Sequence, residues 1–506
     1  MLTMNISKNK RKIELGDWQT PLDLAQKTCR TLVEAGISPA SIIEPTCGKG
    51  SFVFAALETF QSAKHCFGLD ISDEYLAEAI KTIQPFQNRI TASITQGDFF
   101  SFSWEKQIAS MPDPLLVIGN PPWVTNSGIG SIGGRNLPKK SNFQNMKGLD
   151  AITGKSNFDI SEWMIISMLN YLKERDACLA MLCKTAVARK VLLHGWKNQM
   201  PFEWCSIYKI NAQQYFDVAV DACFFVAKLG RKTSAIHCKI YGDLNLNSFE
   251  HLAAFENNRL ITDKALYEKW KHLTAGKDEP FKWRSGIKHD CAKIMELWKE
   301  NNFFRNGLGE SIELEDEHLF PMLKSSDLAN GEITSINRYM LVPQHFVGQQ
   351  TGIIKHNSPK TWNYLQKHSD LLDRRTSVIY RSNPQFSIFG VGDYTFTDWK
   401  IAISGFYKNI RFRLIGPYEG KPVVFDDTCY FLSCRTKEEA MILYEILSSQ
   451  AAEEFLSAYI WWDSKRPITL EILNMISLVK LADFYGKNAL IENIHQDKES
   501  HQLIMF

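Results

Sequence analysis

The sequence predicts an α/β fold: a doubly wound, mostly parallel sheet of seven strands, followed by a C-terminal domain of mixed α+β character. Three observations predict it. Apolar runs of strand length alternate with amphipathic stretches through the first 230 residues, and unusual polar motifs follow the ends of these runs. After Gly230 the sequence becomes more polar, with few sustained strand patterns. Continuous apolar strands separated by helices indicate a parallel sheet that is covered on both faces. We therefore expect one domain over 1–230 and a second over 231–506.

The first elements follow in order from Thr20. Residues 20–36 are typical of a helix, with a capping hydroxyl at Thr20, Pro21 in the first helical position and a closing Gly36. A strand, a glycine turn and a helix come next, and a second strand and a helix capped by Ser72 follow them. Further strands are predicted in the runs RITASITQ (89–96), LLVIGN (115–120), ACLAMLC (177–183), WCSIYKI (204–210) and VDACFFVAKL (220–229), with a helix at 161–173.

Composition limits the class of protein. The chain has 506 residues, of which 44% are hydrophobic and 23% charged, as expected for a globular protein with a substantial core. It contains no apolar run long enough to span a membrane, and its polar, basic start lacks the apolar region of a secretory signal. The 11 cysteines form neither a CxxC pair nor a zinc pattern with histidine, so we expect reduced thiols and no metal site. These features predict a cytoplasmic protein with no membrane partner.

The first polar motif is the turn EPTCGKGSF, residues 44–52, after the first strand. Gly48 and Gly50 let the backbone turn sharply and approach a ligand without interference from a Cβ, and Glu44 ends the strand toward the same crevice. The turn has neither the GxGxxG form of a dinucleotide site nor the form of a phosphate loop, so no pyrophosphate or triphosphate is indicated. Alone, such a turn serves loop geometry as readily as ligand binding.

Two further strand ends carry acidic residues. Asp70 ends the strand in GLDIS, where a carboxylate accepts hydrogen bonds from both hydroxyls of a ribose; the alternative is an aspartate that caps backbone amides. Asp98 in QGDFF is suited to accept from an adenine amino group, with Phe99 covering the ring face. The alternative for Phe99 is an aromatic residue of the core.

The fourth strand ends in the tetrapeptide Asn120-Pro121-Pro122-Trp123. An amino group on an aromatic ring is a poor nucleophile, because its lone pair is delocalised into the ring. Acceptance of its two hydrogens by the Asn120 side chain and the Pro121 carbonyl draws the nitrogen toward tetrahedral geometry, and the two prolines hold these acceptors rigidly. Trp123 then offers a flat face for an extruded base. When the electrophile is a sulfonium methyl group, no acid, nucleophile or metal is needed.

Together these motifs resemble the S-adenosylmethionine-dependent amino-methyltransferases of DNA found in restriction-modification systems. On a Rossmann-like sheet of seven strands, that family carries a glycine motif, an acidic residue ending the second strand, an aspartate near the third and [DNS]PP[YFW] after the fourth. The chain matches with EPTCGKGSF, GLDIS, GDFF and NPPW, and TPLDLA resembles the motif that precedes the glycine turn in one subgroup. This order, followed by a long C-terminal extension, is similar to the gamma arrangement of adenine N6-methyltransferases.

The resemblance implies a function and site residues. S-adenosylmethionine would be the cofactor, and the methyl group would go to N6 of adenine in a specific duplex DNA sequence after base flipping. The chain would act as a monomer that protects host DNA, with a separately encoded restriction endonuclease as a possible partner. The implied cofactor residues are Thr20, Pro21, Glu44, Thr46, Cys47, Gly48, Gly50, Asp70, Asp98 and Phe99, and the implied target-base pocket is Asn120, Pro121, Pro122 and Trp123.

Alternatives stay open at this point. In the gamma arrangement the aromatic is usually Tyr or Phe, whereas Trp is commoner beside a first-position Ser or Asp, including in enzymes that methylate cytosine N4. Asn120 favours adenine over cytosine. Methyltransferases of RNA adenines and of protein glutamines also use NPP[YFW], although they are generally shorter. An idle DNA-binding subunit is the third alternative, and the intact Asn120 and Asp70 argue against it.

The rest of the chain suits DNA recognition. Residues 355–421 hold eleven Lys and Arg against five acidic residues, mixed with aromatics, which is typical of contacts to phosphates and bases. The glycine- and lysine-rich segment 126–148 is expected to be a mobile loop that closes over the flipped base. The predicted DNA-binding residues are Lys139, Lys140, Arg374, Arg375, Arg381 and Arg411. A nuclease is not indicated, because the adjacent Asp426 and Asp427 lack an ExK partner.

Overall fold

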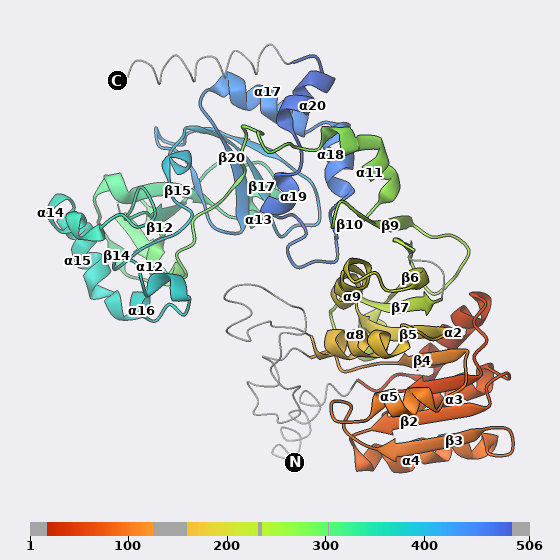
Figure 1. Ribbon diagram of the computed structural model, residues 1–506. Helices are drawn as coiled ribbons and strands as arrows, with labels where there is room; N and C mark the ends of the chain where they lie inside the picture. Colours follow the sequence, from red (N-terminus) through yellow and green to blue (C-terminus); the bar gives the residue numbers. More distant parts are fainter. Residues whose placement is uncertain (1–17, 125–158, 231–234, 302, 488–506) are drawn as a thin grey trace. The chain divides into compact units, whose positions relative to one another are not determined.

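The computed structural model describes residues 18–124, 159–230, 235–301 and 303–487 (Figure 1). The chain divides into two compact units, Met1–Ala265 and Leu266–Phe506. The first unit thus continues past position 230, where the change to a more polar sequence predicted a domain boundary. Lys139, Lys140 and the predicted loop at 126–148 lie outside the described residues.

The first unit alternates strands and helices as far as its seventh strand. In chain order its elements are α2 (Leu22–Glu34), β1 (Ser41–Glu44), α3 (Ser51–Thr59), β2 (His65–Asp70), α4 (Asp73–Ile83), β3 (Thr91–Gln96), α5 (Trp104–Ala109), β4 (Leu115–Gly119), α8 (Ile160–Leu172), β5 (Ala177–Lys184), α9 (Thr185–Lys197), β6 (Phe202–Ile210), α10 (Ala212–Phe216), β7 (Ala222–Leu229), β8 (His237–Tyr241), β9 (His251–Glu256) and β10 (Arg259–Ile261). The predicted strands and helices of 20–230 are all present, and α5, α9 and α10 are additional.

All these strands join one mixed sheet of ten strands, in the order β10-β9-β8-β6-β7-β5-β4-β1-β2-β3. The strands from β3 to β5 pair in parallel, whereas β7 pairs antiparallel with both β5 and β6. The seven predicted strands occupy adjoining positions, and β8, β9 and β10 extend the sheet beyond β6. The predicted count of seven is therefore too low: β8 (five residues), β9 (six) and β10 (three) are partly exposed, and the sequence pattern did not identify them as strands.

The strand order creates a crevice beside β1. The chain leaves β1 toward β2 and β3 on one side and returns through β4 on the other. Ligands of open α/β sheets bind at such a switch point, outside the carboxyl ends of the strands. The alternation of side chains sets the two cores: Leu116 and Ile118 of β4 join a cluster with α2, α3 and α4, and the buried Leu115 and Val117 point to the other face.

Helix starts differ from the sequence expectation in two places. Pro21 occupies the N-cap position of α2 instead of its first turn, and no side chain caps this helix, so Thr20 is not a capping residue. Ser72 stands at the N-cap of α4, but its hydroxyl makes no capping bond, and its main-chain oxygen accepts from Leu76 N. Thr20 is buried and lines the cavity described below.

The second unit contains two sheets and several short helices. One sheet has the order β11-β20-β17-β18 and the other β14-β13-β12-β16-β15-β19. The strands are β11 (Arg284–Ser285), β12 (Glu296–Glu300), β13 (Phe303–Asn306), β14 (Ser311–Ile312), β15 (Leu319–Leu323), β16 (Arg338–Leu341), β17 (Trp399–Ser404), β18 (Arg413–Ile415), β19 (Val424–Phe425) and β20 (Cys429–Cys434). The helices are α11 (Lys264–Trp270), which begins at the unit boundary, α12 (Ala292–Met295), α13 (Ser325–Ala329), α14 (Ile354–Asn357), α15 (Pro359–Lys367), α16 (Ser369–Asp373), α17 (Lys437–Leu447), α18 (Gln450–Ser457), α19 (Leu470–Leu473) and α20 (Leu478–Phe484).

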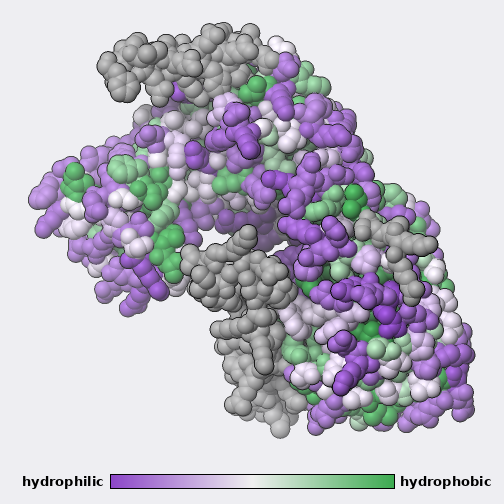
Figure 2. Space-filling model, in the orientation of Figure 1, coloured by the Kyte–Doolittle hydropathy of each residue, from purple (hydrophilic) through white to green (hydrophobic). Residues whose placement is uncertain are grey.

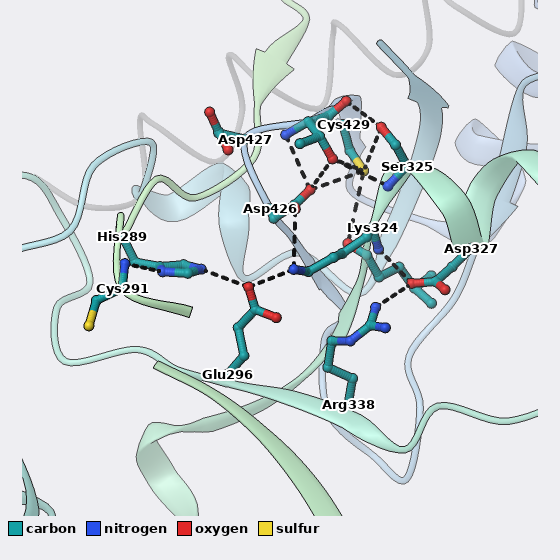
Figure 3. A network of polar contacts seen from close by, with 12 residues as sticks. His289, Cys291, Glu296, Lys324, Ser325, Asp327, Arg338, Asp426, Asp427 and Cys429 are labelled. Atoms are coloured by element: carbon teal, nitrogen blue, oxygen red, sulfur yellow. Dashed lines mark hydrogen bonds and ion pairs between the residues drawn. The ribbon is translucent and has the colours of Figure 1, made fainter. Parts of the chain in front are cut away.

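A buried polar network joins three segments of this second unit (Figure 3). Lys324, after β15, donates to Glu296 Oε1 at 2.6 Å, and its Nζ lies 3.9 Å from Asp426 Oδ2, after β19. His289 Nε2 lies 3.4 Å from the same Glu296 oxygen. Burial alone raises the pKa of Glu296, but the hydrogen bonds from His289 and Lys324 outweigh it and hold this pKa below its ordinary value. The network therefore keeps a buried carboxylate ionised where three segments meet.

The surface carries hydrophilic and hydrophobic residues side by side. Hydrophobic residues form separate patches among hydrophilic ones on the face shown in Figure 2. Across the described ranges, no helix is both long enough and apolar enough to cross a membrane.

Candidate cofactor and substrate site

A cavity opens in the first unit where β1, β2 and β4 end, with about 940 Å³ of empty space when its open mouth is counted. This size is ordinary for the binding site of a small organic ligand. Most of the predicted site residues meet there. Nine of them line the cavity: Thr20, Glu44, Thr46, Cys47, Gly48, Asp70, Phe99, Asn120 and Pro122.

The glycine turn after β1 is held by side chains from two other segments. Gly48 has a φ of +50°, its N–H donates to Asp70 Oδ2 at 2.7 Å, and the next N–H, of Lys49, donates to Gln19 Oε1 at 3.0 Å. A Cβ at Gly48 would lie 2.6 Å from Gln19 Oε1. The conformation therefore favours glycine here, and a Cβ would displace the Gln19 amide that holds the turn.

Gly50 has a different task from the one expected. It has a φ of +85° at the N-cap of α3 and does not line the cavity. A Cβ there would lie 2.8 Å from Thr82 Oγ1 and 3.1 Å from the Cα of Ala79, both in α4. The second glycine thus permits the close approach of α3 and α4, and its contribution to a ligand is indirect.

Asp70 combines the two roles that the sequence left open. Its Oδ2 accepts from Gly48 N and its Oδ1 accepts from Ser72 N at 2.9 Å, so the carboxylate does cap backbone amides. It also lines the cavity. Because each carboxylate oxygen has more than one acceptor direction, these bonds leave capacity for hydroxyl groups of a ligand. The backbone bonds fix the orientation of the carboxylate at the cavity wall.

Three residues at the end of β1 set the polarity of the cavity. Burial raises the pKa of Glu44 well above its ordinary value, although Val53 N donates to its Oε2 at 2.9 Å. Burial likewise raises the pKa of the Cys47 thiol, which excludes a ready thiolate nucleophile. Thr46 Oγ1 is buried and has no hydrogen-bond partner among the described residues. The wall therefore offers an unused hydroxyl to a ligand.

In the segment after β3, the aromatic residues line the cavity, whereas the aspartate does not. Phe99 and Phe100 line the cavity, and Phe99 is otherwise packed against Trp104 and Trp163. Asp98 does not line it, and its Oδ1 accepts from Phe100 N at 3.0 Å. In the structure Asp98 shapes the turn that presents Phe99, which differs from the direct cofactor contact we expected.

Asn120 has a defined amide orientation. Its Nδ2 donates to the main-chain oxygen of Trp18 at 3.0 Å, and its buried Oδ1 has no partner among the described residues. A carbonyl oxygen can only accept, so this contact identifies which end of the amide is the nitrogen. Asn120 and Pro122 line the cavity, whereas Pro121 is buried outside its lining. The cavity therefore contains a preset hydrogen-bond acceptor.

Trp123 lies elsewhere than expected. Its side chain is buried, its Nε1 donates to Leu182 O at 3.3 Å, and its ring packs edge-on against Phe216 with centroids 5.1 Å apart. It does not line the cavity. The prediction that its face is offered to a base differs from this structure, because the indole fills the core between the turn, β5 and α10.

The sequence motifs missed several residues of the cavity wall. Trp18 and Gln19 precede the predicted TPLDLA motif by two positions and one position, and their contacts to Asn120 and the glycine turn join segments far apart in the chain. Pro21 of that motif does not line the cavity. Tyr75, Phe100 and Met164 also line it. Of these residues, Trp18 and Gln19 could have been suspected from the sequence, because they lie directly before a recognised motif.

The predicted DNA-binding residues of the second unit differ in their availability. Arg374 and Arg381 are exposed, and Arg411 is exposed with one contact, from Nη1 to Ala329 O at 3.4 Å. Arg375 is committed within the unit: it donates to Leu372 O and Ser387 O at 2.7 Å each and stacks 3.8 Å from the ring centre of Tyr380. Its guanidinium is therefore a structural group in this unit and not a free DNA contact.

Neither unit offers a metal centre within the ranges described, where no group of three or more His, Cys, Asp or Glu side chains could hold an ion. Asp426 belongs to the buried network of Figure 3, and Asp427 lies 3.5 Å from Arg466. Both carboxylates are therefore close to basic side chains of the second unit.

Comparison with known proteins adds two findings, and no protein-family model matches the chain. The chain is 48% identical over 473 residues to the type II methyltransferase M.NspV of Nostoc sp.. The alignment covers 94% of this chain and 98% of that protein. Among solved structures, the type IIL restriction-modification enzyme MmeI in complex with DNA aligns with a TM-score of 0.54 at 12% identity. That alignment covers 90% of this chain and 64% of the MmeI chain, and at this identity it is a likeness of fold.

Proposed function

The chain belongs to the type II methyltransferases, and from this premise we propose that it transfers the methyl group of S-adenosylmethionine to N6 of adenine in a specific duplex DNA sequence. The reaction would protect host DNA in a restriction-modification system. The observation that carries the proposal is the cavity shared by the glycine turn, Asp70 and the free acceptor Oδ1 of Asn120. A cofactor and an acceptor amine can meet only where both sets of groups face one space.

The residues of the cavity fit S-adenosylmethionine. Thr46 Oγ1 is a buried hydroxyl without a partner among the described residues, Gly48 keeps the turn free of a side chain, and Asp70 is an oriented carboxylate at the wall. We propose that Asp70 receives the ribose, that Phe99 covers the adenine, and that Thr20, Glu44, Thr46 and Cys47 surround the methionine portion. When bound, the cofactor supplies an electrophilic methyl group on a sulfonium centre. No protein nucleophile is required, which agrees with the protonated Cys47.

Asn120 supplies the catalytic acceptor in this proposal. Its Oδ1 accepts one hydrogen of the adenine amino group and the Pro121 carbonyl accepts the other, so that the lone pair of the nitrogen is freed for attack. The Trp18 carbonyl supports this role, since it holds Nδ2 and prevents the amide from turning over. Preorganised acceptors of this kind contribute most when they need no rearrangement during the reaction.

The choice of adenine rests on the motif order and on Asn120. Cofactor motifs, then NPPW, then a long C-terminal unit follow the gamma arrangement of adenine enzymes. Because Trp123 is buried against Phe216, its presence does not bear on the face of the target base. The indole that made cytosine N4 a competitor is then a core residue, and Asn120 favours adenine.

We propose that the first unit is the catalytic domain and the second the target-recognition domain. Arg374, Arg381 and Arg411 are its candidate phosphate contacts, because they are exposed and basic. A monomer would bind duplex DNA and flip the target base out of the helix. The protein would act in the cytoplasm of a prokaryote. A separately encoded endonuclease would cut the same sequence when it is unmethylated.

A methylation assay tests the proposal. The full chain is incubated with labelled S-adenosylmethionine and, in parallel, duplex DNA of mixed sequence, structured RNA and a protein mixture. DNA that takes up label is digested to nucleosides and analysed by mass spectrometry. N6-methyladenine is the expected product; N4-methylcytosine would refute the choice of base, and label in RNA or protein alone would refute the DNA substrate.

A further inference from the structure

We propose that Lys184 is a positioning residue for methyl transfer, because its ammonium group holds the main chain of the NPPW turn. The inference rests on the function proposed above. Lys184 is the last residue of β5, and its Nζ donates to Trp123 O at 2.9 Å and to Asp159 Oδ2 at 2.7 Å. One cation therefore links the last residue of the tetrapeptide to a carboxylate at the start of α8.

The carboxylate that holds Lys184 is itself fixed. Asp159 is buried, and its Oδ1 accepts from Ser161 N at 3.1 Å as the N-cap of α8. The adjacent Ile160 N donates to Val124 O at 2.9 Å. The start of α8 is thus joined to Val124 by a main-chain hydrogen bond and, through Lys184, to Trp123 of the tetrapeptide.

Strand β5 fastens Trp123 a second time. The indole Nε1 donates to Leu182 O, two residues before Lys184. Side chain and main chain of Trp123 are therefore both held by the end of β5. Because Pro121 and Pro122 have restricted φ angles, a fixed Trp123 limits the movement of the preceding residues as well. The acceptors of Asn120 and Pro121 are then held from both ends, by Trp18 and by Lys184.

Removal of the ammonium should harm transfer more than cofactor binding. The Lys184 side chain is 25% exposed, so its two bonds are partly shielded from water and from salt. Without it, Trp123 O loses a charged donor and Asp159 keeps a buried charge with one partner fewer. A misplacement of about 1 Å at a reacting group costs about 100-fold in rate. The glycine turn and Asp70 are held by other contacts and should still bind the cofactor.

Three variants of the full chain test the inference. Lys184→Met removes the ammonium, and Lys184→Arg keeps a cation. Lys190→Met is the matched control, because Lys190 of α9 forms an ion pair of the same kind with Glu162 of α8, at 2.8 Å. Each variant is measured for its single-turnover rate of DNA methylation, its dissociation constant for S-adenosylmethionine and its melting temperature.

We expect Lys184→Met to lower the single-turnover rate about 10- to 100-fold, with a nearly unchanged cofactor dissociation constant. Lys184→Arg should recover a large part of the rate, and Lys190→Met should keep the wild-type rate. If Lys184→Met transfers methyl groups at the wild-type rate, or if Lys190→Met is impaired equally, the inference is wrong while the proposed function stands.

A second measurement does not depend on the substrate. If the wild-type chain methylates no DNA, the proposed function fails, and hydrogen exchange of a peptide spanning 118–124 then decides the role of Lys184. Faster exchange in Lys184→Met than in wild type and Lys190→Met supports a positioning role. Equal exchange in all three proteins overturns it.

Discussion

Asn120 Nδ2 donates to the main-chain oxygen of Trp18 at 3.0 Å, across 102 positions of the chain. The amide donor is therefore used within the protein, and its acceptor, Oδ1, is buried without a partner among the described residues, in a side chain that lines the cavity. An unpaired buried acceptor costs about 1–3 kcal/mol. A ligand that donates a hydrogen bond at this point recovers that cost, which is the physical basis of the role that we propose for Asn120.

Asn120→Ala should therefore abolish methyl transfer while leaving cofactor binding largely intact. Loss of one preorganised group at a reacting centre lowers the rate about 100- to 1,000-fold. The amide contacts Trp18, whereas Asp70 and the glycine turn are held by other bonds. Single-turnover assays and calorimetric titration with S-adenosylmethionine measure the two effects. A large loss of cofactor affinity with normal transfer at saturation would show that Asn120 belongs to the cofactor site instead.

Asp70→Ala should have the opposite profile. The change removes the acceptors of Gly48 N and Ser72 N and the carboxylate at the cavity wall. We expect the dissociation constant for S-adenosylmethionine to rise at least about 10-fold, since a hydrogen bond to a charged group contributes about 1.5–3 kcal/mol. Asp73→Ala, at an exposed position three residues later, is the control and should bind normally. Equal affinity in the two variants would exclude Asp70 from the cofactor site.

Sequence reasoning found the cavity-lining residues at strand ends because those positions follow from local pattern. Asp70 and Asn120 end apolar runs, and parallel strands bring such ends together at one edge of a sheet. It did not find Trp18 or Gln19, since their contacts to Asn120 and Lys49 depend on how the segment before α2 crosses the sheet. No spacing rule in the chain encodes that crossing.

Tertiary packing also decided the roles of two residues that the motifs did name. Trp123 is buried because Leu182 O and Phe216 lie beneath the turn, and Gly50 is required because α4 approaches α3 closely. A tetrapeptide or a glycine turn cannot reveal either neighbour. For the fold, the strands up to β7 were evident, but β8, β9 and β10 are partly exposed strands at one end of the sheet, with β10 at its edge, and their pairing comes from the sheet they join.

Gly50→Ala should destabilise the first unit more than Gly36→Ala does. Both glycines have similar φ angles, +85° and +82°, so the two substitutions carry a similar conformational cost of about 1 kcal/mol. A Cβ at Gly50 meets Thr82 and Ala79 of α4, whereas a Cβ at Gly36 meets nothing within 4 Å. Chemical denaturation of both variants measures the difference, for which overpacking predicts about 1–3 kcal/mol. Equal unfolding free energies would mean that α4 yields without cost.

Lys400→Met should stabilise the second unit, and the gain should depend on pH. Lys400 lies in β17 with 1% of its surface exposed, and burial lowers its pKa to about 7 from an ordinary 10.5. The fold thus favours the neutral amine. Between these two values the unfolded chain binds more protons, so that stability of the wild type rises with pH from about 7 to 10.5. Below pH 7 the buried charge imposes its full cost, on the order of a few kcal/mol.

The melting temperature of Lys400→Met should accordingly exceed that of wild type most at and below pH 7, and the difference should shrink as the pH approaches 10. Lys355→Met, at an exposed position of α14, is the control and should show no such trend. Thr397 O loses its donor from Lys400 in the variant, which subtracts a constant amount at every pH. A pH-independent difference would therefore assign the whole effect to this hydrogen bond and to packing, and would refute a buried, titrating amine.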